Sequence, residues 1–167
     1  MTYTFRPLYP ADETMFCGWL DQPHIAGWWG RGAEEWALVK HDFADPNQPV
    51  DMRIVEHGGT PFAYVQDYDV TAFDAPQYAD LPSASRAIDT FLGAVQFLGK
   101  GHAAAYLAQR TNTLLAQGAQ TIAVDPDPNN TRAIAAYARA GFIKHRITPC
   151  EDGDPVQVMV KSYPSVC

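Results

Sequence analysis

The chain has 167 residues, of which 47% are hydrophobic and 19% charged, and its 12 lysines and arginines against 19 aspartates and glutamates give a net charge of −7. This composition excludes an intrinsically disordered chain, and the length indicates about one domain. No apolar run approaches the roughly 18 residues that a membrane-spanning helix needs. The start of the chain, Met1 to Pro7, lacks the basic and then apolar pattern of a signal peptide, so we expect one cytoplasmic domain over residues 1–167.

The expected elements of the first half combine helical and strand periodicity. They are a strand over 3–9, helices over 11–20 and 33–43, and a hairpin of strands 52–56 and 61–68 around Gly58-Gly59. We expect residues 69–85 to form a long loop with at most one turn of helix. Loops of this length in compact domains commonly cover or line a binding site.

In the second half, strands and helices alternate, which predicts a mixed α/β fold around one sheet. The expected elements are a strand over 86–92, a helix over 99–117, a strand over 121–124, a helix capped by Asn130 and closed by Gly141, and a hairpin of strands 142–148 and 156–160.

The negative charge is concentrated in one part of the chain. Residues 42–89 contain nine acidic residues but only Arg53 and Arg86, so this stretch accounts for the whole net charge. An acidic field repels nucleic acids and attracts polycations, although acidic surfaces also serve solubility alone. We therefore expect no nucleic-acid or membrane partner.

Cysteines and histidines form no recognisable metal motif. Cys17, Cys150 and Cys167 are scattered, with no C-x-x-C pair, and the five histidines lack the spacing of a zinc site. We expect buried free thiols for two of the cysteines, with Cys167 in a loose tail, and no bound metal.

A glycine-rich turn between an expected strand and helix is the most distinctive local pattern: Gln96-Phe97-Leu98-Gly99-Lys100-Gly101-His102-Ala103. Glycines let the backbone approach a ligand closely, and N–H groups ahead of a helix favour an anion such as a pyrophosphate. No Ser or Thr follows Lys100, which excludes a Walker A loop, and Ala104 stands where a dinucleotide fingerprint needs glycine. Alone, such a turn is more often structural than functional.

Two motifs together resemble the GNAT superfamily of N-acetyltransferases. Gln96-x-x-Gly99-x-Gly101 resembles its loop for the pyrophosphate of acyl-CoA, and Asn130-x-x-Ala133-x-x-x-Tyr137-x-x-x-Gly141-Phe142 resembles its second conserved helix. The resemblance implies the GNAT fold, a mixed, mostly antiparallel twisted sheet with splayed central strands, flanked by helices. It also implies acetyl-CoA as cofactor, bound by Phe91, Gln96, Phe97, Leu98, Gly99, Lys100, Gly101, His102, Ala103, Asn130, Ala133 and Tyr137.

Further motifs resemble the aminoglycoside 6′-N-acetyltransferases within that superfamily. They include Trp28-Trp29-Gly30, Tyr64-x-Gln66-x-Tyr68, Ile88-Asp89 and Asp125-Pro126-x-Pro128-x-Asn130. The resemblance covers residues 16–30 and 58–160 and is weakest over 69–85, where that family's tryptophan-rich, substrate-covering segment has no counterpart. It implies an antibiotic-resistance activity, in which the 6′-amine of an aminoglycoside attacks acetyl-CoA directly in a ternary complex.

Attack of an amine on a thioester needs an acceptor for the ammonium proton, a donor for the departing thiolate and an N–H group for the oxyanion. Asp89 is the expected base, because a charge inside an apolar strand is costly unless it faces a cleft. Tyr137 is the expected acid, since a phenol with a pKa near 10 can protonate a thiolate. The alternatives are a structural ion pair for Asp89 and core packing for Tyr137.

Other polar and aromatic residues are candidates for binding the acceptor. We interpret Asp125 and Asp152 as carboxylates for further ammonium groups, although each also suits a turn. The full expected set is Trp28, Trp29, Gln66, Tyr68, Asp89, Asp125 and Asp152, with core packing as the alternative for the two tryptophans.

Two other functions stay open. The same fold could acylate a polyamine, a protein amine or a siderophore hydroxylysine, or it could serve as a non-catalytic acyl-CoA-binding module. We expect a monomer or a homodimer.

Overall fold

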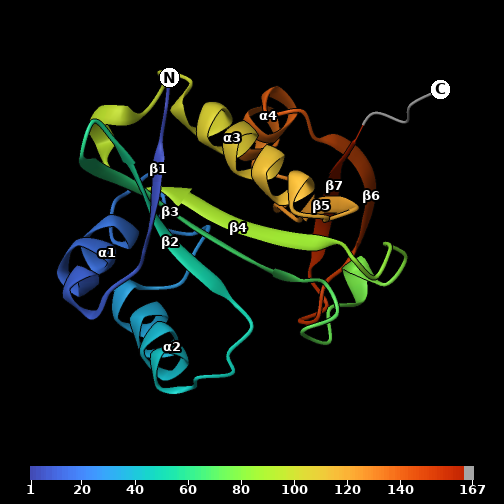
Figure 1. Ribbon diagram of the computed structural model, residues 1–167, viewed down its shortest axis with the longest axis horizontal. Coiled ribbons are helices and arrows are strands. Elements are labelled where there is room, and N and C mark those ends of the chain that lie inside the picture. Colours follow the sequence, from blue (N-terminus) through green and yellow to red (C-terminus); the bar gives the residue numbers. More distant parts are fainter. Residues whose placement is uncertain (164–167) are drawn as a thin grey trace. The chain divides into compact units, whose positions relative to one another are not determined.

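The computed structural model describes residues 1–163, which include seven strands paired in the order β1-β2-β3-β4-β5-β7-β6 (Figure 1). The strands are β1 (Thr4–Pro7), β2 (Asp51–His57), β3 (Thr60–Asp69), β4 (Arg86–Leu92), β5 (Thr121–Val124), β6 (Ile143–Pro149) and β7 (Pro155–Ser162). The pairs β1/β2, β5/β7 and β6/β7 are antiparallel, whereas β4/β5 is parallel. The expected fold class, a mixed and mostly antiparallel sheet with helices, is confirmed.

Two compact units share this chain. One consists of Met1, Asp67–Asp89 and the chain from Gly101 onward, and we call it the acidic unit; the other consists of Thr2–Gln66 and Thr90–Lys100, and we call it the aromatic unit. Strands β3 and β4 contribute residues to both units. No helix among residues 1–163 is long and apolar enough to cross a membrane.

The aromatic unit is built on a cluster of rings. Helices α1 (Glu13–Leu20) and α2 (Gly32–Ala44) lie side by side in it. Phe16 of α1 contacts Trp36 of α2, with ring centroids 5.4 Å apart, and also Tyr64 and Phe91 at 5.0 and 5.5 Å. Burial of such rings supplies much of the stabilisation of a core of this size.

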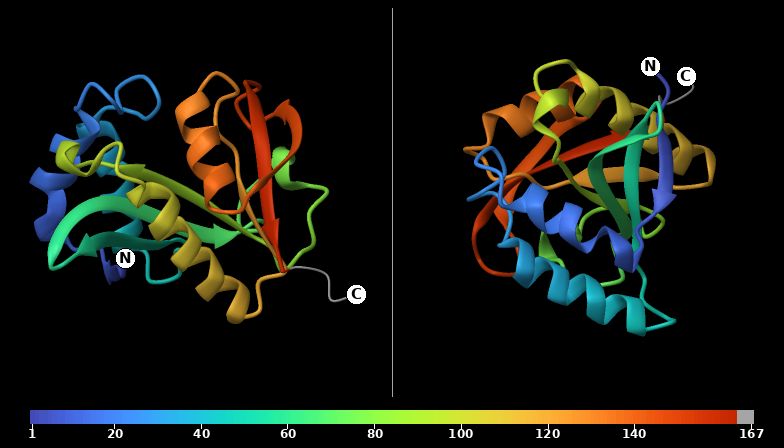
Figure 2. Two further views of the ribbon diagram at one scale, coloured as in Figure 1. Left: turned by 90° about the horizontal axis from the view of Figure 1, so that it is seen from above. Right: turned by 90° about the vertical axis from the view of Figure 1, so that its left-hand side faces the viewer.

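The acidic unit packs helices α3 (His102–Ala116) and α4 (Thr131–Arg139) side by side (Figure 2). Its apolar core is made of buried residues from β4, β5, β7 and the segment between β3 and β4: Val70, Tyr78, Ala87, Ala123, Val156 and Val158. That segment contains one short 3-10 helix, η2 (Pro76–Tyr78), as the sequence predicted.

The parallel ladder between β4 and β5 is short. It consists of Arg86 opposite Ile122 and Ala87 opposite Ala123, although both strands continue beyond these residues. The splay of the central strands that the resemblance implies stays a prediction.

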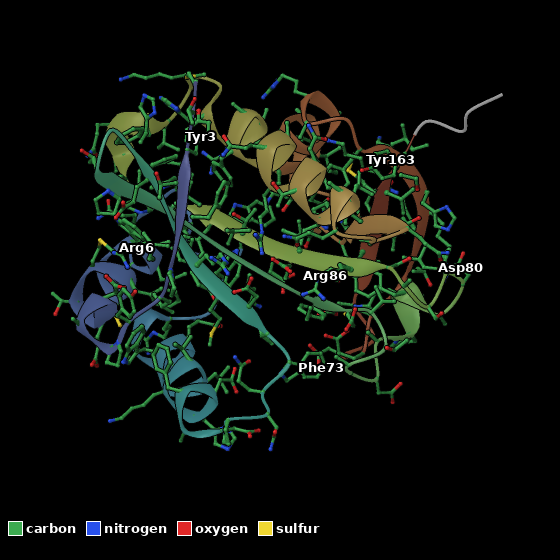
Figure 3. All side chains as sticks on the ribbon, viewed as in Figure 1. Tyr3, Arg6, Phe73, Asp80, Arg86 and Tyr163 are labelled. Carbon is green, nitrogen blue, oxygen red and sulfur yellow. The ribbon has the colours of Figure 1, made fainter. Side chains whose placement is uncertain are left out.

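A buried carboxylate ties three elements of the acidic unit together. Asp67, near the end of β3, is 1% exposed and accepts hydrogen bonds from Nε of Arg86 at 2.8 Å and Nη2 of Arg110 at 2.5 Å. Arg86 begins β4 (Figure 3), and Arg110 lies in α3. Arg110 is 7% exposed, and its guanidinium is buried against Asp67.

Most expected element boundaries hold within one or two residues, but one helix begins later than expected. The helix expected from residue 99 begins at His102, because Gly99 and Gly101 have φ of +70° and +81°, which an α-helix excludes. Asn130 caps α4 by accepting a hydrogen bond from the Ala133 N–H, as expected. Cys17 and Cys150 are free thiols but are only partly buried, so the expected burial was wrong, and Cys167 lies outside the described residues.

Replacing Asp67 tests the buried ion cluster. Asp67→Asn keeps the side-chain shape but leaves the Arg110 guanidinium buried without its counter-charge, so we expect a loss of about 3–5 kcal/mol in the free energy of unfolding, measured by urea denaturation. The matched change Asp69→Asn removes a carboxylate that is 60% exposed and should cost less than about 1 kcal/mol. Equal effects of the two changes would contradict this assignment.

Candidate functional site

Two aspartates occupy equivalent positions on neighbouring strands of the acidic unit. Because Ala87 pairs with Ala123 in a parallel ladder, Asp89 and Asp125 follow their paired residues by the same two positions. Asp125 directly follows β5, and it lies near enough to Asp89 for the charge of Asp89 to raise its pKa.

Tyr68 of β3 contacts the first of these carboxylates. Its side chain forms a hydrogen bond with Asp89, and burial is the main cause that raises the pKa of its phenol. The negative charges of Asp89, Asp125 and Glu151 raise that pKa further. The phenol therefore stays protonated at neutral pH and can donate its proton to a hydrogen bond.

Asp125 has a strongly perturbed carboxyl group. Burial, followed by the charge of Asp89, raises its pKa to about 7, although hydrogen bonding from Gln77 acts in the opposite direction. A carboxyl group with this pKa exchanges its proton near neutral pH, and a nearby positive charge would favour its ionised form.

The third acidic residue comes from the turn between β6 and β7. Gln77 of η2 donates hydrogen bonds from Nε2 to Oδ2 of Asp125 at 3.0 Å and to Oε2 of Glu151 at 2.8 Å. Asp152, which the sequence nominated, lies in the same turn and is exposed. Its role in substrate binding stays a prediction, whereas Glu151 is the turn residue that joins the cluster.

Two of these carboxylates, Asp125 and Glu151, lack a cationic partner among the described residues. Across residues 1–163, no lysine or arginine forms an ion pair with Asp125 or Glu151. Among the same residues, no three His, Cys, Asp or Glu side chains are arranged to hold a metal ion. We call Asp89, Asp125 and Glu151 the acidic cluster; its geometry suits an organic cation with several ammonium groups.

Tyr137 lies on the buried face of α4 and is 8% exposed. Burial is the main cause that raises the pKa of its phenol, and the charges of Asp89 and Asp125 contribute. Its ring packs on Phe142, with centroids 5.7 Å apart. Tyr137 therefore has both the core contacts of a structural residue and an electrostatic link to the acidic cluster.

The glycine-rich turn has the backbone shape that the sequence suggested. A Cβ at Gly99 or Gly101 would meet no atom within 4 Å, so glycine is required there by the positive φ and not by crowding. Lys100 folds back to donate a hydrogen bond from Nζ to the carbonyl oxygen of Gln96 at 2.7 Å. An exposed, left-handed turn ahead of α3 presents backbone N–H groups of the kind that bind anions.

Two residues expected near the ligands have other contacts in the aromatic unit, whereas a third is exposed. The Phe91 side chain is 5% exposed and packs on Trp29, with ring centroids 5.0 Å apart. Gln66 accepts a hydrogen bond from the Tyr64 hydroxyl at 2.7 Å. Trp28, by contrast, is 45% exposed, which leaves much of its ring able to contact a ligand.

Sequence reasoning missed Gln77 and Glu151. Gln77 lies within the loop expected over 69–85 and is 2% exposed. Nothing in its local pattern distinguishes it from an ordinary loop residue. Glu151 directly precedes Asp152, and only the conformation of the turn decides which of the two side chains reaches Gln77.

Comparisons with known proteins agree with this geometry. Residues 9–148 match the acetyltransferase (GNAT) domain family. The chain is 29% identical over 165 residues to aminoglycoside N(6')-acetyltransferase type 1 of Klebsiella pneumoniae, covering 93% of this chain and 81% of that protein. It matches the crystal structure of aminoglycoside acetyltransferase AAC(6')-Ib with coenzyme A and kanamycin at a TM-score of 0.82 and 27% identity, covering 97% and 95% of the two chains. The fold is also that of an aminoglycoside N(6')acetyltransferase from Legionella pneumophila, at a TM-score of 0.77 and 21% identity, covering 96% and 91%.

The raised pKa of Asp125 predicts a pH-dependent stability. The native carboxyl group, with a pKa of about 7, holds a proton that the unfolded chain releases near pH 4, so the free energy of unfolding should fall as the pH rises through that window. Asp125→Asn removes this dependence, and its stability relative to the wild type should rise by up to about 4 kcal/mol between pH 4 and pH 8.

Urea denaturation at a series of pH values measures this difference. Asp152→Asn is the matched control, because its side chain is exposed, and it should follow the wild-type curve. Parallel curves for the wild type and Asp125→Asn would contradict the perturbed carboxyl group.

Proposed function

The chain belongs to the GNAT acetyltransferase family, and we propose that it transfers the acetyl group of acetyl-CoA to a primary amine of a polycationic small molecule, with the 6′-amine of an aminoglycoside as the preferred acceptor. The acidic cluster is the observation that carries this proposal. Asp89, Asp125 and Glu151 lie close enough to affect one another or their shared neighbour Tyr68, and Asp125 and Glu151 have no basic ion-pair partner among residues 1–163. Ammonium groups would supply the missing positive charge.

The nature of the relatives supports the same acceptor. The protein from Klebsiella pneumoniae is named for acetylation of the 6′-amine of aminoglycosides, and AAC(6')-Ib was crystallised with coenzyme A and kanamycin. Kanamycin carries several ammonium groups at neutral pH, as the acidic cluster requires of its ligand.

Asp89 is the proposed acceptor of the amine's proton. An alkylammonium ion cannot attack a thioester until it loses a proton, and a carboxylate within hydrogen-bond reach can take that proton directly or through one water. The hydrogen bond with Tyr68 fixes the orientation of Asp89, while Asp125 and Glu151 bind other ammonium groups. The freed nitrogen forms a bond to the acetyl carbon as the carbon–sulfur bond breaks.

Tyr137 is the proposed donor to the departing thiolate. Its buried phenol stays protonated at neutral pH, because burial raises its pKa. A donated hydrogen bond stabilises the negative charge that grows on sulfur. Backbone N–H groups suit the oxyanion of the acetyl group, since they need no reorganisation during the reaction.

We propose that residues 96–103 bind the pyrophosphate of acetyl-CoA. The positive φ of Gly99 and Gly101 and the exposed Lys100 beside them support this assignment. Asn130 and Ala133 at the start of α4, with Phe91 and Tyr137, complete the proposed cofactor contacts. Since the matched family spans residues of both units, we propose that they act as a single acetyltransferase domain.

The reaction is proposed to take place in the cytoplasm, which supplies acetyl-CoA. The acidic cluster is formed within one chain, so the proposed chemistry suits a monomer or a homodimer equally.

Release of free thiol from acetyl-CoA tests the function directly. We expect turnover with kanamycin to exceed turnover with a lysine-containing peptide by at least about 10-fold, because two or more ammonium groups gain attraction from the acidic cluster. A panel that adds polyamines and hydroxylysine identifies any other preferred acceptor. Absence of thiol release with kanamycin would remove the aminoglycoside from the proposal, and a preference for the peptide would favour a protein amine.

Asp89→Asn tests the proposed base. The amide cannot accept the ammonium proton, so kcat should fall at least about 10²-fold while the dissociation constant of acetyl-CoA, measured by calorimetry, changes little. Asp74→Asn changes an exposed acid of the same acidic stretch and should leave both quantities unchanged. An unaltered kcat in Asp89→Asn would exclude Asp89 as the base.

A further inference from the structure

Gln77 joins two carboxylates that come from different parts of the acidic unit. Its side chain is 2% exposed, and its Nε2 group donates to Asp125 at the end of β5 and to Glu151 in the turn between β6 and β7. Both hydrogen atoms of one amide are thereby used to hold two acids. The distances of 3.0 and 2.8 Å are those of well-formed hydrogen bonds.

A buried neutral amide is an unusual partner for two carboxylates, of which Asp125 is partly buried and Glu151 is exposed, because proteins commonly pair carboxylates with cations. In the same unit, Asp67 has cationic partners of this kind, since it is paired with both Arg86 and Arg110. Gln77 instead supplies donors without supplying charge. Asp125 and Glu151 are therefore held in place while their negative charge remains available to a ligand.

The oxygen atom of the same amide is a second, independent indication that a ligand binds here. Oε1 of Gln77 is buried and has no hydrogen-bond partner among residues 1–163. Buried polar atoms without a partner are rare in native proteins, and each suggests a missing ligand or water. An ammonium group carries three N–H donors and no acceptor, so it suits a carbonyl oxygen beside two carboxylates.

We infer that Gln77 is a positioning and specificity-determining residue, which holds Asp125 and Glu151 for a second ammonium group of the acceptor while Asp89 receives the reacting amine. This inference rests on the proposed function and adds the residue that makes the site select for at least two positive charges. The selectivity arises because Gln77 positions the two acids without neutralising them.

Gln77→Leu tests the inference with two simple competitors of kanamycin acetylation. Cadaverine carries two ammonium groups and pentylamine carries one on a chain of the same length. The inhibition constant of cadaverine should rise about 10-fold or more in Gln77→Leu, because charge-assisted hydrogen bonds are lost with the placement of the acids. The inhibition constant of pentylamine should change by less than about twofold.

Gln157→Leu is the matched control. Gln157 is also buried in the acidic unit, and its Nε2 group donates to the carbonyl oxygens of Arg146 and Val158 at 3.1 and 3.0 Å. The control loses the same number of amide hydrogen bonds but none to a carboxylate. Its ratio of inhibition constants for cadaverine and pentylamine should equal that of the wild type.

Gln77→Lys separates charge selection from simple anchoring. A lysine can still bind both carboxylates, so the acids stay in place and the fold keeps its stability, but its charge replaces the second ammonium group. We expect this variant to lose the preference for cadaverine as fully as Gln77→Leu does. A preserved preference in Gln77→Lys, or equal effects of Gln77→Leu on both amines, would overturn the inference.

Failure of the inference about Gln77 can be distinguished from failure of the proposed function. If the wild-type protein acetylates no amine, the proposed function fails, and dissociation constants of the two amines are then measured directly by calorimetry. Wild-type binding of cadaverine no tighter than that of pentylamine would overturn the inference about Gln77 as well.

Discussion

The acidic unit depends on the buried pairing of Asp67 with Arg86 and Arg110. Asp67 directly precedes Tyr68 in β3, and Arg86 lies three residues before Asp89 in β4. By joining the end of β3, the start of β4 and helix α3, this ion cluster fixes the relative position of the two residues that hydrogen-bond beside the proposed reaction centre. A rigid support of this kind lets a reactive carboxylate keep one orientation.

The acidic unit contains two groups of acids that differ in the charge of their hydrogen-bond partners. Asp67 is fully paired with guanidinium groups and serves the fold, whereas Asp125 and Glu151 share only the neutral amide of Gln77. Burial without a cationic partner makes the ionised form of Asp125 unfavourable in the free protein, and the pKa of its carboxyl group is therefore raised. Unfavourable electrostatics that a ligand of opposite charge would relieve are typical of functional sites.

Local patterns in the sequence predicted most strand and helix bounds and the helix cap, because these features depend on residues that are near one another in the chain. Strand β5 has the expected bounds, and Asn130 caps its helix. The helix after the glycine-rich turn was placed three residues too early, because periodicity does not reveal the left-handed conformation of Gly99 and Gly101. The roles of Gln77, Glu151 and Arg110 depend on partners far away in the chain, so no sequence pattern could indicate them.

Glu151 of the acidic cluster comes from the turn between β6 and β7, whose residues belong to neither strand. Cys150-Glu151-Asp152-Gly153-Asp154 contains three acids, of which the first reaches Gln77. Hairpin connections tolerate insertions and deletions far better than strands do. A shift of one residue would bring a shorter carboxylate toward Gln77, so related enzymes could evolve to fit differently spaced amines by changing this connection alone, without altering the residues on β4 and β5.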